Sequence, residues 1–196
     1  MIVLAAGRGS RFADPTHKLA QTLGESSVLA ATLANAIASH LHVVVVTTAA
    51  FAEVACSSVA ARDVVVLPDV GSAGAGPLGM GVSIAAGVNA CPSASGWLVL
   101  PGDMPLVQPA TLLAVARSLD HHAIAYAQHR GRRGHPVGFA SELYSELAAL
   151  SGDEGARRLI ARYPAFGVEL DDPGILVDID TASDLDAVRR KVAASA

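Results

Sequence analysis

Short apolar runs alternate along this chain with longer stretches that mix alanine with polar residues. The runs at 3–5, 42–48 and 63–68 have the length and apolar character of buried strands. Between them, residues 27–39 and 51–61 are long and alanine-rich enough to form helices. We therefore expect strands and helices to alternate through the first third of the chain.

The same alternation continues towards the C-terminus, with one departure. We expect a glycine-rich loop at 70–81, a helix at 82–90, a strand and loop at 96–107, a helix from about 109, helices at 141–150 and 154–163, and a final strand and helix at 175–190. Residues 121–139 instead hold two strand-like runs around a basic glycine turn, which predicts an antiparallel excursion. The fold class is therefore α/β, with a mostly parallel sheet covered by helices.

Length and composition restrict the class of protein. A chain of 196 residues suffices for a single domain, which we expect to span 1–196. Apolar residues make up 52% and aromatic residues only 4%, so the core must be built from Ala, Val and Leu. The net charge of −4 argues against a general nucleic-acid binder, and any phosphate-binding positive charge must be local.

Neither a membrane span nor a disulfide framework is expected. No apolar run approaches the roughly 20 residues that a membrane helix needs. The N-terminus lacks the basic and apolar regions of an export signal, so we expect a cytoplasmic protein. Cys56 and Cys91 form neither a CxxC pair nor a cluster with histidine, which excludes a sequence-evident zinc site.

The first strand runs into LAAGRGSRF, residues 4–12, where large apolar side chains give way to glycine and arginine. A glycine-rich turn after a strand lets backbone N–H groups converge on phosphate oxygens. Phe12 stands where a dinucleotide fingerprint needs its third glycine, and no Walker motif is present. Arg8, Arg11 and Lys18 add the charge that a triphosphate requires. The alternative is a solvated turn with ordinary surface bases.

Two further segments supply carboxylates. Asp103, in PGDMP, follows a buried strand at the sheet edge where α/β proteins bind ligands. Mg²⁺ takes one or two carboxylates together with phosphate oxygens, so Asp103 is a candidate metal ligand; the alternative is a turn-forming aspartate. Asp178 and Asp180 are two apart on a predicted short strand and so share one face. Asp180 completes the metal site if that strand lies near Asp103; otherwise the pair only precedes a helix.

Taken in order, the motifs resemble the MobA-like nucleotidyltransferases, and within them the molybdenum cofactor cytidylyltransferases. The motifs are LAAGRGSRF with HKL, GPLGMGVSIAAG, PGDMPLV, GRRGHPVGF, GDEGAR and DIDTASDL. The resemblance covers nearly the whole chain and implies a Rossmann-like three-layer fold. It also implies Mg²⁺-dependent transfer of CMP from CTP to the terminal phosphate of molybdopterin, with release of pyrophosphate. LAAG in place of LAGG, through Ala6, resembles the cytidine-using branch.

The resemblance assigns roles residue by residue. Arg11, Lys18 and Asp103 would be catalytic, and Asp103 with Asp180 would hold Mg²⁺. The expected nucleotide-binding residues are Leu4, Ala5, Ala6, Gly7, Arg8, Gly9, Ser10, Gly79, Met80, Gly81, Ser83 and Gly102. The nucleotide part would cover about 1–107 and the acceptor part about 108–196.

The acceptor site is expected to use Arg133, His135 and Arg157. We expect His135 to bind and not to act as a base, because an ionised phosphate nucleophile needs none. GDEGAR, which contains Arg157, is alternatively only a helix start. The expected partners are CTP, molybdopterin and a molybdenum hydroxylase or its chaperone. Alternatives are a transferase using GTP or another phosphate acceptor, and a non-catalytic nucleotide- or cofactor-binding chaperone.

Overall fold

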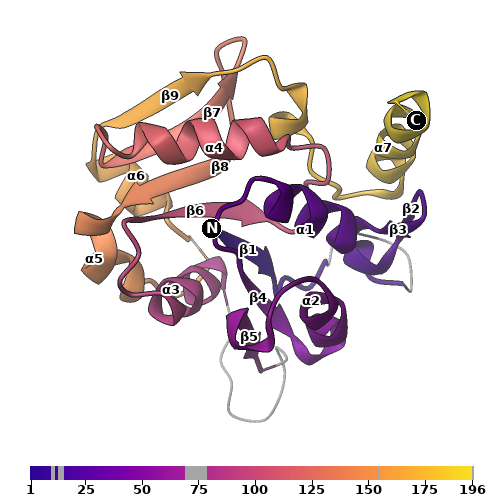
Figure 1. Cartoon of the computed structure of the whole chain (residues 1–196), viewed down its shortest axis with the longest axis horizontal. Helices are drawn as coiled ribbons and strands as arrows, with labels where there is room; N and C mark the ends of the chain where they lie inside the picture. Colours follow the sequence, from indigo (N-terminus) through magenta and orange to yellow (C-terminus); the bar gives the residue numbers. More distant parts are fainter. Residues whose placement is uncertain (10–11, 13–15, 69–78, 154, 196) are drawn as a thin grey trace.

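The structure is a computed structural model that describes residues 1–9, 12, 16–68, 79–153 and 155–195. A seven-stranded sheet forms its middle layer, and helices cover both faces (Figure 1). The strands are β1 (Ile2–Ala5), β4 (Val44–Thr48), β5 (Val64–Leu67), β6 (Gly96–Pro101), β7 (Ile124–His129), β8 (Arg132–Ala140) and β9 (Ala165–Glu169). Their order across the sheet is β5-β4-β1-β6-β8-β7-β9.

The sheet is parallel except at β8. The pairs β1–β4, β4–β5, β1–β6 and β7–β9 are parallel, whereas β8 is antiparallel to both β6 and β7. A separate two-stranded antiparallel hairpin joins β2 (Thr22–Leu23) to β3 (Ser26–Ser27). This three-layer α/β architecture confirms the predicted fold class, including the antiparallel excursion around the basic turn.

Seven α-helices and five short 3₁₀ turns connect the strands within the described residues. The helices are α1 (Val28–Ala38), α2 (Ala52–Ser58), α3 (Met80–Ala90), α4 (Pro109–Ser118), α5 (Tyr144–Ala148), α6 (Arg157–Arg162) and α7 (Ala182–Ser195). The 3₁₀ turns are η1 (Lys18–Ala20), η2 (Ala49–Phe51), η3 (Ala61–Asp63), η4 (Ser141–Leu143) and η5 (Pro173–Leu176). No helix in these ranges is both long and apolar enough to cross a membrane.

Alternate residues of each central strand feed two separate apolar clusters, because successive side chains of a strand point to opposite faces. On β1, Val3 joins the cluster packed under α1, α2, α4 and α7, while Ile2 joins the cluster under α3, α5 and α6. Trp97 is the largest fully buried side chain of the second cluster. α7 lies beside the β2–β3 hairpin (Figure 1), where the Arg189 guanidinium donates to the Thr22 carbonyl.

Two helices, α1 and α7, begin at side-chain caps. The Ser27 hydroxyl accepts from the Ala30 N–H at 3.2 Å and begins α1. Before α7, the Thr181 N–H donates to the Asp184 carboxylate at 2.7 Å, and the Asp184 N–H returns a bond to the Thr181 hydroxyl at 3.2 Å. Thr181 and Asp184 therefore form a capping box at the start of α7.

One predicted strand is absent from the structure, and one observed strand was not predicted. Residues 175–180 do not form a strand: Leu176 ends η5, and 177–180 have no regular structure. The Ile179 N–H bonds to the Asp103 carbonyl at 3.2 Å instead of joining a strand ladder. β9 was not predicted, and the loop predicted at 70–81 lies mostly outside the described residues, with α3 already starting at Met80.

Candidate active site

The carboxyl ends of β1 and β6 open onto a cavity of about 650 Å³. β1 pairs with β4 on one side and with β6 on the other. The cavity therefore lies where the order of the strands across the sheet reverses, which is where open α/β sheets bind ligands. The described residues that line it are Leu4, Ala6, Gly7, Arg8, Gly9, His17, Lys18, Leu19, Gly79, Met80, Ser83, Pro101, Asp103, Met104, His135, Asp153, Arg157, Asp178 and Asp180.

The glycine-rich loop forms one wall of this cavity. Gly9 has φ of +59°, a left-handed conformation that favours glycine. Its carbonyl accepts from the Phe12 N–H at 2.9 Å, and Phe12 is buried in the apolar cluster next to β1. The loop is thus anchored at both ends while Arg8 lines the cavity. The predicted residues Ser10 and Arg11 lie outside the described residues.

Lys18 and two carboxylates form the polar centre of the site. The Lys18 ammonium donates to Asp103 Oδ2 at 2.5 Å and to Asp180 Oδ1 at 2.8 Å. Asp103 follows β6, where the Gly102 N–H donates to the β1 carbonyl of Leu4 at 2.8 Å. Gly102 allows this approach because a Cβ there would lie 2.9 Å from the same oxygen.

The carboxylates suit a divalent cation. Asp103 is only 9% exposed, and its Oδ1 is buried without a hydrogen-bond partner. Asp103 Oδ2 and Asp180 Oδ1 already converge on one cationic group, the Lys18 ammonium. In the described ranges no cluster of three or more His, Cys, Asp or Glu side chains is arranged to hold a metal. Two carboxylates completed by phosphate oxygens and water are the arrangement that Mg²⁺ prefers.

The surroundings set the charge states. Burial alone would lower the pKa of Lys18, but attraction and hydrogen bonding from Asp103 and Asp180 raise it above its ordinary value of 10.5, so the ammonium stays charged. Burial lowers the pKa of His135 below 6.5, although Asp103 and Asp178 oppose the shift. His135 is therefore a neutral imidazole at pH 7, with one donor and one acceptor nitrogen.

The start of α3 is pressed against a loop from much later in the chain. The Gly81 N–H donates to the Gly152 carbonyl at 3.0 Å. A Cβ at Gly79 would lie 2.0 Å from that oxygen, so only glycine permits the contact. Consequently the Gly81 N–H is engaged within the chain, and Met80 and Ser83 face the cavity. Asp153, next to the contact, reaches the same cavity.

The predicted residues divide into two groups. Most of those described line the cavity, including His135 and Arg157 from the expected acceptor motifs. Arg133 does not: its guanidinium lies 4.3 Å from the centre of the Tyr126 ring. Ala5, Gly81 and Gly102 are also absent from the lining and act as backbone neighbours of it.

Some lining residues were missed from the sequence. They include His17, Leu19, Met104 and Asp153. His17 directly precedes Lys18, and Asp153 lies within GDEGAR, so proximity to a motif was the available signal. Asp180 was preferred to Asp178 as a metal ligand. Both residues line the cavity, although the strand that was expected to orient them is absent.

Comparison with known proteins extends the resemblance. Residues 1–166 match the model of the MobA-like NTP transferase domain. Over 117 residues the chain is 36% identical to the purine catabolism protein PucB of Bacillus subtilis (strain 168). That alignment covers 57% of this chain and 57% of the relative.

Solved structures share the fold along nearly the whole chain. The crystal structure of Rv0371c from Mycobacterium tuberculosis H37Rv has a TM-score of 0.80 and 28% identity, covering 96% of this chain and 95% of that one. A complex of the same protein with manganese has a TM-score of 0.75 and 27% identity, covering 96% of each chain. A nucleotidyl transferase from Methanothermobacter thermautotroptrophicus has a TM-score of 0.80 and 26% identity, covering 100% and 97%. The chain therefore belongs to the MobA-like NTP transferase family, and it is a nucleotidyltransferase.

Proposed function

We propose that this nucleotidyltransferase transfers CMP from CTP to the terminal phosphate of molybdopterin. An acceptor phosphate oxygen forms a bond to the α-phosphorus of CTP, the bond from that phosphorus to the β-phosphate oxygen breaks, and pyrophosphate leaves. The observation that carries the proposal is the convergence of Lys18, Asp103 and Asp180 beside the glycine-rich loop in one cavity. Positioned cations are the main catalytic requirement of phosphoryl transfer.

The chain's own groups have distinct roles in this proposal. Backbone N–H groups of Gly7 and Gly9 hold the triphosphate, and Lys18 and Arg11 stabilise charge on the phosphates as pyrophosphate departs. Met80 and Ser83 contact the nucleoside. The charged Lys18 suits this role because it remains protonated while close to the carboxylates.

Asp103 and Asp180 would hold Mg²⁺, which when bound neutralises charge on the phosphate oxygens. The buried, unpartnered Oδ1 of Asp103 supports this assignment. The manganese complex of Rv0371c supports a divalent ion in a related protein, and Mg²⁺ as the ion here is part of the proposal.

For the acceptor, His135 and Arg157 are the proposed contacts, since both line the cavity. A neutral His135 donates one hydrogen bond to a phosphate without acting as a base. We assign the nucleotide to about 1–107 and the acceptor to about 108–196 of a single domain. The product would be passed to a molybdenum hydroxylase or its chaperone. The PucB relative is named for purine catabolism, so the acceptor is less well supported than the nucleotidyl transfer itself.

The test is pyrophosphate release with each of the four nucleoside triphosphates and Mg²⁺, with and without molybdopterin. We expect CTP to be preferred and release to require molybdopterin. Preference for GTP, or turnover with another phosphate acceptor, would replace the substrate assignment. Asp103→Ala is the matched variant, and undiminished pyrophosphate release by it would remove Asp103 from the metal role. Tight CTP binding by the wild type without any turnover would favour a carrier protein.

A further inference from the structure

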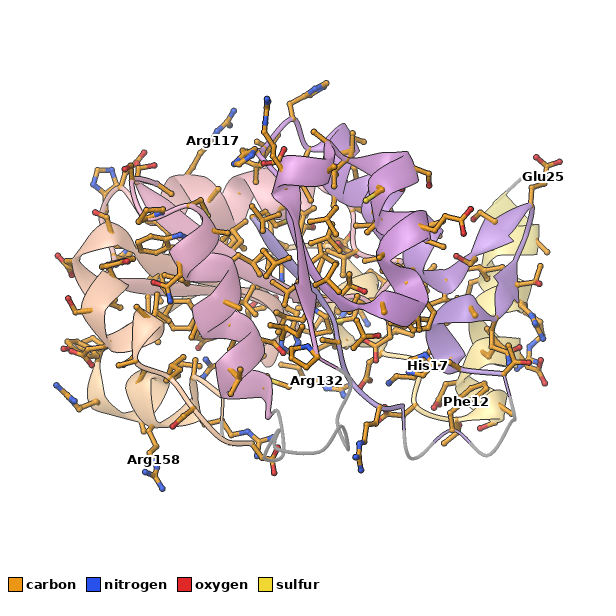
Figure 2. The ribbon with its side chains drawn as sticks, turned by 90° about the horizontal axis from the view of Figure 1, so that it is seen from below. Phe12, His17, Glu25, Arg117, Arg132 and Arg158 are labelled. Carbon is orange, nitrogen blue, oxygen red and sulfur yellow. The ribbon has the colours of Figure 1, made fainter. Side chains whose placement is uncertain are left out.

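His17 lies where the glycine-rich loop meets the turn that carries Lys18. Its Nε2 is 3.0 Å from the Gly7 carbonyl oxygen, and its Nδ1 is 3.2 Å from the Leu19 nitrogen. The imidazole also packs on the Phe51 ring, with the ring centres 4.8 Å apart. Figure 2 shows His17 on the same side of the molecule as Phe12, at the far end of the loop. One side chain thus links the glycine-rich loop, the turn that carries Lys18, and η2.

The hydrogen bonds define the tautomer of His17. The Leu19 N–H can only donate, so Nδ1 is the acceptor and the proton is on Nε2. Nε2 then donates to the Gly7 carbonyl. Both ring nitrogens are used within the chain, which leaves neither free to act as a general base.

The Gly9 backbone lies directly against this ring. A Cβ at Gly9 would be 3.0 Å from the His17 Nε2, so the loop approaches the imidazole more closely than a side chain would comfortably allow. The bond to the Gly7 carbonyl also fixes the plane of the following peptide, and with it the direction of the Arg8 N–H. Glycine-rich segments lose much conformational entropy when they are ordered. A loop that is already held by His17 loses less of this entropy when a triphosphate binds.

We propose that His17 is a positioning residue for nucleotidyl transfer: its imidazole fixes the glycine-rich loop relative to Lys18, so that backbone donors and the ammonium group reach one triphosphate together. The inference rests on the proposed triphosphate role of the loop, and it is independent of which nucleotide or acceptor is used. His17 acts through Gly7, Gly9 and Lys18 and need not touch the reacting atoms.

Two variants separate the two hydrogen bonds. In His17→Asn the side-chain oxygen can accept from Leu19 in place of Nδ1, but the side chain is too short to donate to Gly7. In His17→Gln the amide nitrogen can reach Gly7, but the acceptor for Leu19 is lost. His42→Asn is the matched control, because His42 is 63% exposed and pairs with Asp63 away from the cavity.

The measurements are calorimetric binding of CTP and of GTP with Mg²⁺, KM and kcat for pyrophosphate release, and the melting temperature. We expect His17→Asn to melt close to the wild type yet to bind the triphosphate about tenfold more weakly, the effect of about one hydrogen bond, with a matching rise in KM. His17→Gln should retain more binding than His17→Asn, and His42→Asn should behave as wild type.

Wild-type binding and KM in both His17 variants would overturn the inference. So would losses that merely follow a lower melting temperature, since that is the signature of a structural role. A wild type that binds a triphosphate but fails with molybdopterin would refute the proposed acceptor while the binding comparison still decides the role of His17. A wild type that binds no triphosphate would overturn both.

Discussion

Replacing Lys18 by methionine should make the protein bind a divalent metal more tightly while lowering its activity. In the proposed site, the Lys18 ammonium and a metal held by Asp103 and Asp180 would compete for the same two oxygen atoms, Asp103 Oδ2 and Asp180 Oδ1. Methionine keeps an unbranched side chain of similar length and removes the ammonium group with its charge and its N–H donors. The metal then no longer has to displace an ammonium group.

The distances give the size of the effect. A hydrogen bond to a charged group contributes about 1.5–3 kcal/mol, and the metal must break two of them at 2.5 and 2.8 Å. The side chains keep solvent contact, 13% for Lys18 and 26% for Asp180, so water compensates for part of this loss. We expect the free energy of metal binding to become more favourable by about 1.5–3 kcal/mol, which corresponds to roughly 10- to 150-fold tighter metal binding.

The assay is titration of the nucleotide-free protein with Mn²⁺, following the free ion by electron paramagnetic resonance. Lys18→Arg keeps the charge and should bind Mn²⁺ about as the wild type does. Lys191→Met is the charge-matched control, because Lys191 lines a separate cavity beside η5 and α7. Unchanged or weaker Mn²⁺ binding by a folded Lys18→Met would refute the shared-oxygen reasoning.

Three further outcomes concern stability. Asp172 is buried and accepts from the Gln108 and Gly174 N–H groups and the Thr111 hydroxyl, so Asp172→Ala should cost about 3–4 kcal/mol in urea unfolding, while Asp171→Ala, 97% exposed, should change little. Gly79→Ala should lower the melting temperature by forcing a Cβ onto the facing carbonyl, a cost of about 1–3 kcal/mol. The hydrogen bond from the Thr181 hydroxyl lowers the pKa of Asp184 below 3.8, so its stabilisation is present above pH 3.8 and is lost as the pH falls further; Asp184→Asn should flatten that acid loss in thermal unfolding.

The strands of the first half were predictable because their burial is visible in the sequence. Val44–Thr48 pairs with a strand on each side, and the apolar run at its start matches four consecutive buried positions. β9, Ala165–Glu169, was missed because it is an edge strand with Phe166 and Glu169 exposed, so no apolar run or clean alternation marks it. The false strand at 175–180 had the opposite cause: its apolar residues pack into the core from the 3₁₀ turn that Pro173 begins and from the irregular segment after it.

The site was predictable residue by residue but not as an arrangement. Asp103 follows a strand with a clear apolar pattern, so its place at the sheet edge could be inferred. The contacts of Lys18 join residues 85 and 162 positions apart, and no local pattern records such distances. Position 79 is a second example: it requires glycine because the Gly152 carbonyl, far away in the sequence, lies against it.

The charge of the cavity wall bears on the form in which a nucleotide enters. Among the described lining residues, four carboxylates face three permanent cations, namely Asp103, Asp153, Asp178 and Asp180 against Arg8, Lys18 and Arg157. A free triphosphate would add further negative charge beside these described residues, whose carboxylates outnumber their permanent cations, and the Lys18 ammonium is largely neutralised by its own partners. In the proposed site, a divalent ion carried by the triphosphate would be held by Asp103 and Asp180, and the Lys18 ammonium would then be available to the phosphates. We therefore expect the described lining residues to favour the metal–nucleotide complex over the free nucleotide, with metal binding coupled to phosphate binding by Lys18.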